Sequence, residues 1–211
     1  MPNIGSMQST QKFVFEDQEE CVCVTIPDTC NTQYGMYTWP CAPMLAQYVW
    51  DHRGDFKGRR VLELSAGTAL PGIVALKCGA DVQFSDIPEC MDSVRLSCAA
   101  NGLTDVQILE IIWGNFQQGS AISLLTDLDW VLASDCFFDS SDFEDIVATL
   151  AYLLERNVNC VCLFAYQLRT LSYSIENLLY KWNLTASLLE MTTDSVPTIQ
   201  LFKLTVNKTN N

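Results

Sequence analysis

The chain has 211 residues, enough for one domain with a sizeable core, and 49% of its residues are hydrophobic. Twelve lysines and arginines stand against twenty-five aspartates and glutamates, which gives a net charge of −13. This charge argues against direct binding to nucleic acid or to an anionic membrane, because both need cations on the protein surface. It suits either a basic protein partner or a surface whose charge serves solubility.

The first seventeen residues lack the basic and apolar segments of a signal peptide, and no apolar run is as long as a membrane span. We therefore expect the ten cysteines to be thiols in a reducing compartment. We also expect the protein to be a monomer of the cytoplasm and nucleus. No C-x-x-C pair is present and His52 is the only histidine, so we expect no metal site and give His52 no catalytic role.

The N-terminal part of the chain predicts a hairpin and a helix. Residues 1–11 are polar and are expected to form a disordered tail. Apolar runs at 13–15 and 22–26 flank an acidic turn, as in a short hairpin. Pro40 suits the first turn of a helix, and apolar residues then recur at helical spacing as far as His52.

From residue 61 onward strands and helices alternate. Strands are expected at 61–64, 82–86, 106–112, 130–135 and 158–166, with helices around 73–79, 91–101, 143–154 and 175–182. Two further strands, 184–189 and 199–206, are joined only by a turn at 192–197, so the last one should run antiparallel. The pattern predicts a Rossmann-like, doubly wound α/β fold with a mostly parallel seven-strand sheet. We expect one domain over residues 12–206 and a tail at 207–211.

In such a sheet a ligand binds beyond the carboxyl ends of the strands, where the strand order reverses. The first strand of the alternation ends in the run Ser65, Ala66, Gly67, whose small residues let a ligand approach the backbone. The second ends in Asp86, nineteen residues after Gly67, at a distance typical of a carboxylate that binds ribose hydroxyls. These features indicate a nucleoside cofactor.

A dinucleotide is a poor match for this loop. The positions of the G-x-G-x-x-G fingerprint are occupied by Ser65, Gly67 and Leu70. Glu63 would also crowd a pyrophosphate, whereas a carboxylate there suits an amine or a sulfonium. S-adenosylmethionine fits that description, with S-adenosylhomocysteine as its product.

The run from Glu63 to Gly72 resembles the first motif of the seven-strand S-adenosylmethionine-dependent methyltransferases. The segments 37–40 (YTWP), 112–114 (IWG) and 133–138 (ASDCFF) narrow the resemblance to family 16, the protein lysine and arginine methyltransferases. The resemblance covers roughly residues 34–185. It departs from the broader family at Ser65 and Ala69, where glycine is common, and at Phe138, where tyrosine is an alternative.

In addition to the role of the Glu63 carboxylate, the resemblance implies roles for other individual residues. Trp39 would line the cofactor pocket, Ser65, Ala66 and Gly67 would cradle the methionine moiety, Asp86 would hold the ribose, Trp113 would pack on the adenine, and Ser134 would contact the cofactor. The side chains at Ser65 and Ala69 would take space near the cofactor and weaken its binding.

For the substrate, the resemblance implies that Asp135 begins an Asp-x-x-Phe motif that faces the incoming side chain. Asp135 is the candidate catalytic residue, since it can orient an amine or a guanidinium. The alternative is that Asp135 is a helix N-terminal residue stabilised by the helix dipole. The acidic residues that follow, at 139, 142, 144 and 145, are expected to form an exposed first turn of the next helix.

The sequence therefore predicts a protein N-methyltransferase acting on a basic protein, with a histone as one candidate. Arginine and lysine both stay open as the target. A small-molecule methyltransferase would need a lid domain, for which 211 residues leave little room. A cofactor-binding module without turnover is a third alternative, which Ser65 and Ala69 keep open.

Overall fold

We describe the protein from a computed structural model, which covers residues 9–27, 37–167, 175–192 and 198–207. Most of the expected N-terminal tail, the turn at 193–197 and the last four residues of the C-terminal tail lie outside these described residues.

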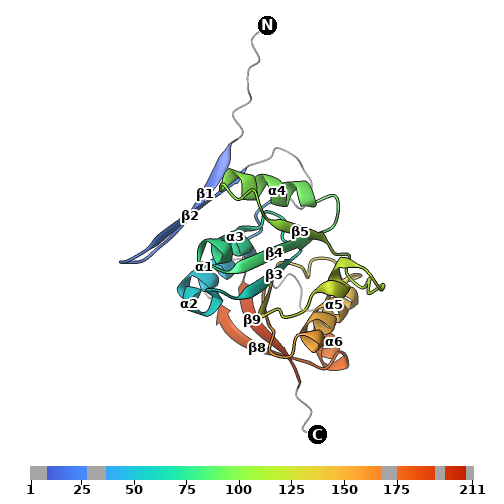
Figure 1. Cartoon of the computed structure of the whole chain (residues 1–211). Coiled ribbons are helices and arrows are strands. Elements are labelled where there is room, and N and C mark those ends of the chain that lie inside the picture. Colours follow the sequence, from blue (N-terminus) through green and yellow to red (C-terminus); the bar gives the residue numbers. More distant parts are fainter. Residues whose placement is uncertain (1–8, 28–36, 168–174, 193–197, 208–211) are drawn as a thin grey trace.

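A seven-stranded sheet forms the centre of the molecule, in the order β5-β4-β3-β6-β7-β9-β8 (Figure 1). The strands are β3 (Arg60–Leu64), β4 (Asp81–Asp86), β5 (Gln107–Glu110), β6 (Trp130–Ser134), β7 (Val161–Gln167), β8 (Leu184–Met191) and β9 (Ile199–Val206). Neighbouring strands from β5 to β7 are parallel, while β9 runs antiparallel to both β7 and β8. The expected sheet and its antiparallel last strand are therefore confirmed.

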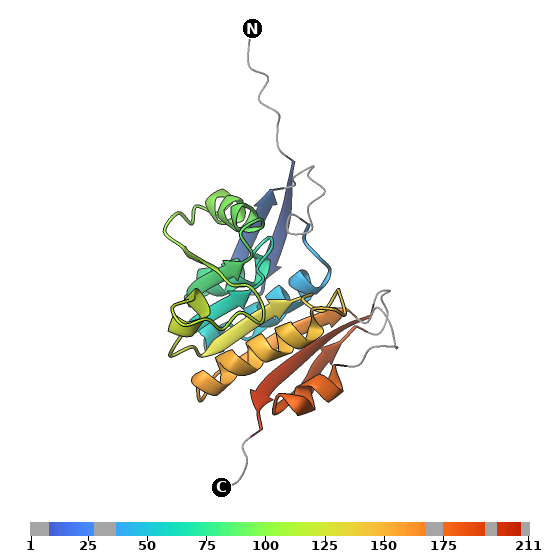
Figure 2. The same cartoon turned by 90° about the vertical axis from the view of Figure 1, so that its right-hand side faces the viewer.

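Helices cover both faces of the sheet, so the fold is doubly wound. One face carries α1 (Cys41–Asp51), α3 (Leu70–Lys77) and α4 (Met91–Ala100), with the short α2 (Arg53–Phe56) after α1. The other carries α5 (Phe143–Arg156), α6 (Glu176–Lys181) and the 3-10 turn η2 (Ala121–Leu124). Figure 2 shows α5 and α6 in front of the sheet, with the cyan α1 behind it.

Alternation along the central strands explains the two cores. Val61 in β3 and Leu132 in β6 belong to the core under α1 and α3, whereas Leu62 and Val131 belong to the core under α5. Successive side chains of a strand point to opposite faces, so a strand covered on both faces is apolar at most positions.

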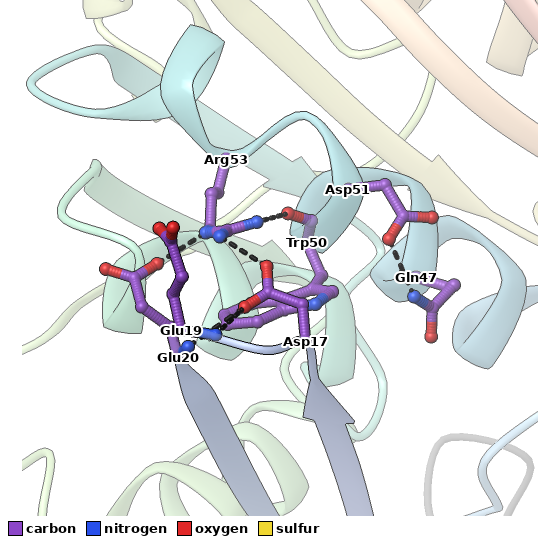
Figure 3. A network of polar contacts seen from close by, with 7 residues as sticks. All are labelled: Asp17, Glu19, Glu20, Gln47, Trp50, Asp51 and Arg53. Carbon is purple, nitrogen blue, oxygen red and sulfur yellow. Dashed lines mark hydrogen bonds and ion pairs between the residues drawn. The ribbon is translucent and has the colours of Figure 1, made fainter.

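The hairpin of β1 (Thr10–Glu16) and β2 (Cys21–Pro27) lies outside the main sheet and packs on α1, α3 and α4. Its turn is tied to α2 by Arg53, which donates to Asp17 and Glu20 at 2.5 Å each (Figure 3). The same guanidinium lies over the Trp50 ring, 4.4 Å from its centroid. These contacts hold the turn of the hairpin against α2 and the end of α1.

Several element boundaries differ from the sequence prediction, among them those of β1, β5 and β7. β1 begins at Thr10, so residues 10 and 11 belong to the hairpin and not to a disordered tail. β5 spans only Gln107–Glu110. β7 begins at Val161, because Val158 is 81% exposed and the Cys160 N–H closes a turn on the Asn157 carbonyl. None of the described helices has the length and apolar character that crossing a membrane requires.

Candidate active site

A cleft of about 400 Å³ opens at the carboxyl ends of the central strands. It lies at the point where the strand order reverses. From β3 the chain first adds β4 and β5 toward one edge of the sheet, and then adds β6 and β7 on the other side of β3. Its lining comprises Trp39, Ser65, Gly67, Asp86, Ile87, Cys90, Ile112, Trp113, Ser134, Asp135, Cys136, Phe138, Asp142 and Asp145. Seven of the nine residues assigned to a site from the sequence are among these.

The loop after β3 is tightly folded. Ser65, Gly67 and Ala69 all have positive φ, at 54°, 54° and 59°. This backbone conformation is easy for glycine and costs a residue with a side chain about 1–2 kcal/mol. Only Ser65 of the two non-glycine residues lines the cleft, since the Ala69 methyl is fully buried in the core under α3. The expectation that Ala69 takes up space in the cleft is therefore wrong.

Asp86, at the end of β4, supports this loop directly. Its Oδ2 accepts a hydrogen bond from the Gly67 N–H at 2.7 Å, and its Oδ1 accepts one from the Ile87 N–H at 2.8 Å. The Cys90 thiol is hydrogen-bonded to the same carboxylate. Burial raises the pKa of Asp86, and the hydrogen bonds oppose that rise. A carboxylate has about four acceptor positions, so Asp86 can still receive a further donor from a ligand.

Two tryptophans contribute to the walls of the cleft. The Trp113 Nε1–H donates to the Ser65 hydroxyl at 3.0 Å, and its ring centroid lies 6.3 Å from that of Phe138. Trp39 packs edge-on against Tyr37, with centroids 5.0 Å apart. Together with Ile87 and Ile112, these rings give the cleft a large apolar surface.

Glu63 and Ala66 do not line the cleft. The Glu63 side chain points to α3, where its Oε2 accepts the Gly72 N–H at 2.9 Å, while its Oε1 has no hydrogen-bond partner in the described part of the chain. Burial raises the pKa of this carboxyl well above its ordinary value. Ala66 packs in the core and donates its N–H to the Ser85 carbonyl. Sequence reasoning placed both beside the cofactor because it could not tell which face of the loop each side chain takes.

The part of the cleft beside the end of β6 and the start of α5 is acidic. Asp135 follows β6 with φ 58°, and its N–H donates to the Ala165 carbonyl of β7 at 2.9 Å. It lies eight residues before α5 begins at Phe143, so the alternative of a helix N-terminal residue is wrong.

The expected acidic first turn is present at the start of α5, with Asp145 exposed, but sequence reasoning did not foresee that Asp142 and Asp145 also line the cleft. Both reach the cleft from the start of α5. Gly114, with φ 72°, makes room for this, since a Cβ there would meet the Asp145 Oδ1 at 2.7 Å. Gly114 directly follows Trp113 in the IWG segment. A glycine at this place is the sequence signal that could have indicated the close approach of another side chain. No lysine, arginine or histidine of the described ranges lines the cleft.

These features suit a nucleoside that carries a cationic group. The volume falls in the range of small-molecule sites, Asp86 can accept from a hydroxyl, and the apolar walls can hold a purine. The neighbouring carboxylates favour positive charge. S-adenosylmethionine combines a ribose, an adenine, a sulfonium and an amine, so the residues present fit it. Nothing in the described part of the chain groups three or more metal-ligating side chains.

Comparison with solved structures identifies the fold. A ribosomal protein L11 methylase from Lactobacillus delbrueckii is 20% identical, with a TM-score of 0.57 over 79% of each chain. A magnesium protoporphyrin IX methyltransferase from Synechocystis, solved with bound S-adenosylmethionine, is 15% identical, with a TM-score of 0.54 over 76% of this chain and 75% of that one. At these identities the likeness concerns the fold alone.

Sequence comparison identifies the family. A family model described as lysine methyltransferase matches residues 18–177. Histone-arginine methyltransferase METTL23 of Mus musculus is 42% identical over 85% of this chain and 74% of its own length, and that of Homo sapiens is 44% identical over 71% and 79%. EEF1A lysine methyltransferase 3 of Xenopus tropicalis is 30% identical over 54% and 50%. The chain belongs to the lysine methyltransferase family, whose enzymes methylate proteins with S-adenosylmethionine as the donor.

Proposed function

We propose that this methyltransferase acts on an arginine side chain of a basic protein, with histones as the first candidate. The observation that carries the proposal is the charge of the cleft: its charged lining residues are all carboxylates, namely Asp86, Asp135, Asp142 and Asp145. A cationic side chain is the natural complement of such a cleft. The relatives named as histone-arginine methyltransferases support the same target.

The carboxylates favour arginine over lysine on physical grounds. A lysine must lose a proton before it can attack, which costs about 4–5 kcal/mol at pH 7, and nearby carboxylates raise this cost by stabilising the ammonium. A guanidinium keeps its charge, and a carboxylate can draw that charge toward one nitrogen and away from the attacking one. An acidic cleft therefore opposes the lysine reaction and assists the arginine reaction.

The residues of the chain supply orientation. S-adenosylmethionine provides an electrophilic methyl group, and the protein has to hold the nucleophilic nitrogen in line with it. Asp135 stands at the carboxyl end of β6, next to Ser134 and 5% exposed, where it can accept N–H bonds from a guanidinium. Asp142 and Asp145 can attract the same cation from the start of α5.

The first experiment identifies the substrate. The purified protein is incubated with labelled S-adenosylmethionine and, separately, with core histones, a whole-cell protein extract and a metabolite extract. We expect label in a protein fraction, released as methylarginine on hydrolysis. Methyllysine, or label only in the metabolites, would contradict the proposal.

A second experiment tests Asp135. Asp135→Asn keeps the shape and removes the charge, so the dissociation constant of S-adenosylhomocysteine should stay within about threefold while kcat falls by about 10²-fold or more. Asp139→Asn is the matched control, because Asp139 is a nearby carboxylate that does not line the cleft. Weak cofactor binding with normal kcat at saturation would make Asp135 a cofactor ligand instead.

We further propose that the protein is a monomer of the cytoplasm and nucleus that binds neither nucleic acid nor membranes directly. The net charge of −13 supports the absence of such binding. Light scattering of the purified protein, DNA and vesicle binding assays, and imaging of the tagged protein test these points.

A further inference from the structure

Ser65 combines an unfavourable backbone conformation with a specific side-chain contact. Its φ of 54° would be easy for glycine, and a serine costs about 1–2 kcal/mol there. Strain of this kind persists where surrounding contacts over-determine the conformation, which occurs often at functional sites. The question is what the serine side chain contributes that a glycine could not.

The hydroxyl of Ser65 accepts a hydrogen bond from the Trp113 Nε1–H at 3.0 Å, across 48 residues of sequence. The contact therefore joins the loop after β3 to the segment after β5. Both residues line the cofactor cleft.

The backbone beside Trp113 is held by another interaction. The Gly114 N–H donates to the Thr149 hydroxyl of α5 at 2.9 Å, and this hydroxyl donates in turn to the Asp145 carbonyl. These bonds fix the path of the chain but leave the indole ring to be oriented separately. Within the described residues, the bond to Ser65 is the hydrogen bond that the Trp113 ring makes.

We propose that Ser65 is a positioning residue, whose hydroxyl holds the Trp113 indole in place as a wall of the cofactor cleft. A wall fixed before binding spares the cofactor the loss of side-chain freedom that ordering the ring would otherwise require. The strained backbone of Ser65 is retained because only a residue with a side chain can make this bond. The inference rests on the cleft being the cofactor site of the methyltransferase.

The test uses three single variants of the full-length protein. Ser65→Ala keeps the Cβ and loses the hydroxyl. Ser65→Gly loses the hydroxyl and also relieves the backbone strain. Trp113→Phe keeps an aromatic ring and loses the N–H donor. For each, the dissociation constant of S-adenosylhomocysteine is measured by calorimetry, together with the melting temperature and the KM and kcat for S-adenosylmethionine.

We expect each variant to weaken S-adenosylhomocysteine binding by about three- to tenfold, the range for loss of one hydrogen bond. The double variant of Ser65→Ala and Trp113→Phe should bind no more weakly than the weaker single variant, because both remove the same bond. The KM for S-adenosylmethionine should rise with the dissociation constant, while kcat stays within about twofold. Ser65→Gly should melt no lower than Ser65→Ala and still bind weakly.

Trp130→Phe is the matched control, because Trp130 lies at the opposite end of β6 from the cleft and packs on Phe56. It should bind S-adenosylhomocysteine as the wild type does. Wild-type affinity in Ser65→Gly, or additive losses in the double variant, would overturn the positioning role while leaving the methyltransferase assignment intact. Absence of binding by the wild-type protein would instead overturn the cofactor site itself.

Discussion

At the scale of single residues, the Glu63 carboxyl is fully enclosed and receives one hydrogen bond, from the Gly72 N–H of α3. Its raised pKa means that the folded protein holds the proton at pH values where the unfolded chain, with a pKa near 4.3, has released it. Stability that is present below about pH 4.3 is therefore lost as the pH rises through the folded pKa.

Glu63→Gln tests this linkage, because glutamine keeps the acceptor for Gly72 and cannot ionise. The free energy of unfolding of the variant relative to wild type should increase from pH 5 to pH 8, by about 1.4 kcal/mol for each unit between the folded and unfolded pKa. Denaturant unfolding across this range measures it. The charge of Asp86 adds to the rise in the pKa of Glu63, so the difference between the two proteins includes this coupling. A difference that does not change with pH would mean that Glu63 is ionised in the folded protein.

Asp86 supports the loop after β3 and is proposed to bind the ribose, and one substitution tests both functions. Asp86→Ala removes the acceptor of the Gly67 and Ile87 N–H groups, so the free energy of unfolding should fall by about 1–3 kcal/mol. It also removes the acceptor proposed for the ribose hydroxyls, so the dissociation constant of S-adenosylhomocysteine should rise tenfold or more. Calorimetry and melting curves distinguish the two effects. Lower stability with unchanged affinity would confine Asp86 to support of the loop.

At the scale of elements, α3 sits unusually close to the sheet. A Cβ at Gly72 would lie 2.3 Å from the Glu63 Oε2 and 2.6 Å from the Phe84 Cε1, and both neighbours are buried. Gly72→Ala should therefore lower the free energy of unfolding by about 1–3 kcal/mol, as overpacking does.

Gly54→Ala is the control for Gly72→Ala, because a Cβ at Gly54 of α2 would meet nothing within 4 Å. Alanine favours helices over glycine by about 1 kcal/mol, so this variant should be as stable as wild type or more stable. Equal losses in both variants would show that backbone freedom and not close packing explains the effect. Thermal and urea unfolding provide the comparison.

The elements themselves were largely predictable from the sequence, because strands buried on both faces are continuous apolar runs. β3 and β6 were found in this way within one residue of their bounds. Boundaries were wrong where a local turn determined the end, as at Val158 before β7. The position of β9 between β7 and β8 is not contained in local periodicity, since it depends on pairing between distant segments.

The site was predictable where residues end a strand or follow it directly. Ser65, Asp86 and Ser134 reach the cleft because the ends of parallel strands meet at one edge of the sheet. Glu63 was misplaced, because it lies within β3, two positions before Ser65, and its side chain points under α3. Asp145 was missed, because its approach depends on the absence of a side chain at Gly114, which comes from another part of the chain.

At the scale of the whole molecule, charge and fold are coupled at the cleft. The sheet order brings the ends of β3, β4 and β6 together, and α5 adds its first turn from the far face. Four carboxylates converge there in a protein whose net charge is −13. The potential of the cleft is therefore reinforced by the overall charge, and should attract a cationic protein segment before contact.

This attraction predicts that salt affects the KM for the protein substrate but not the affinity for S-adenosylhomocysteine. At an ionic strength of about 0.1 M charges are screened beyond about 10 Å, and at 1 M beyond about 3 Å. Raising the salt from about 0.05 M to 0.5 M should increase the KM for an arginine-rich histone peptide by tenfold or more, while kcat changes little, because screening weakens encounter with the cleft and not the orientation within it. The affinity for S-adenosylhomocysteine, which carries no net charge, should stay within about twofold and serves as the internal control. Steady-state kinetics with the peptide and calorimetry with S-adenosylhomocysteine give both values.

A peptide KM that does not respond to salt would mean that the acidic surface serves solubility alone and that the substrate is recognised by contacts within the cleft.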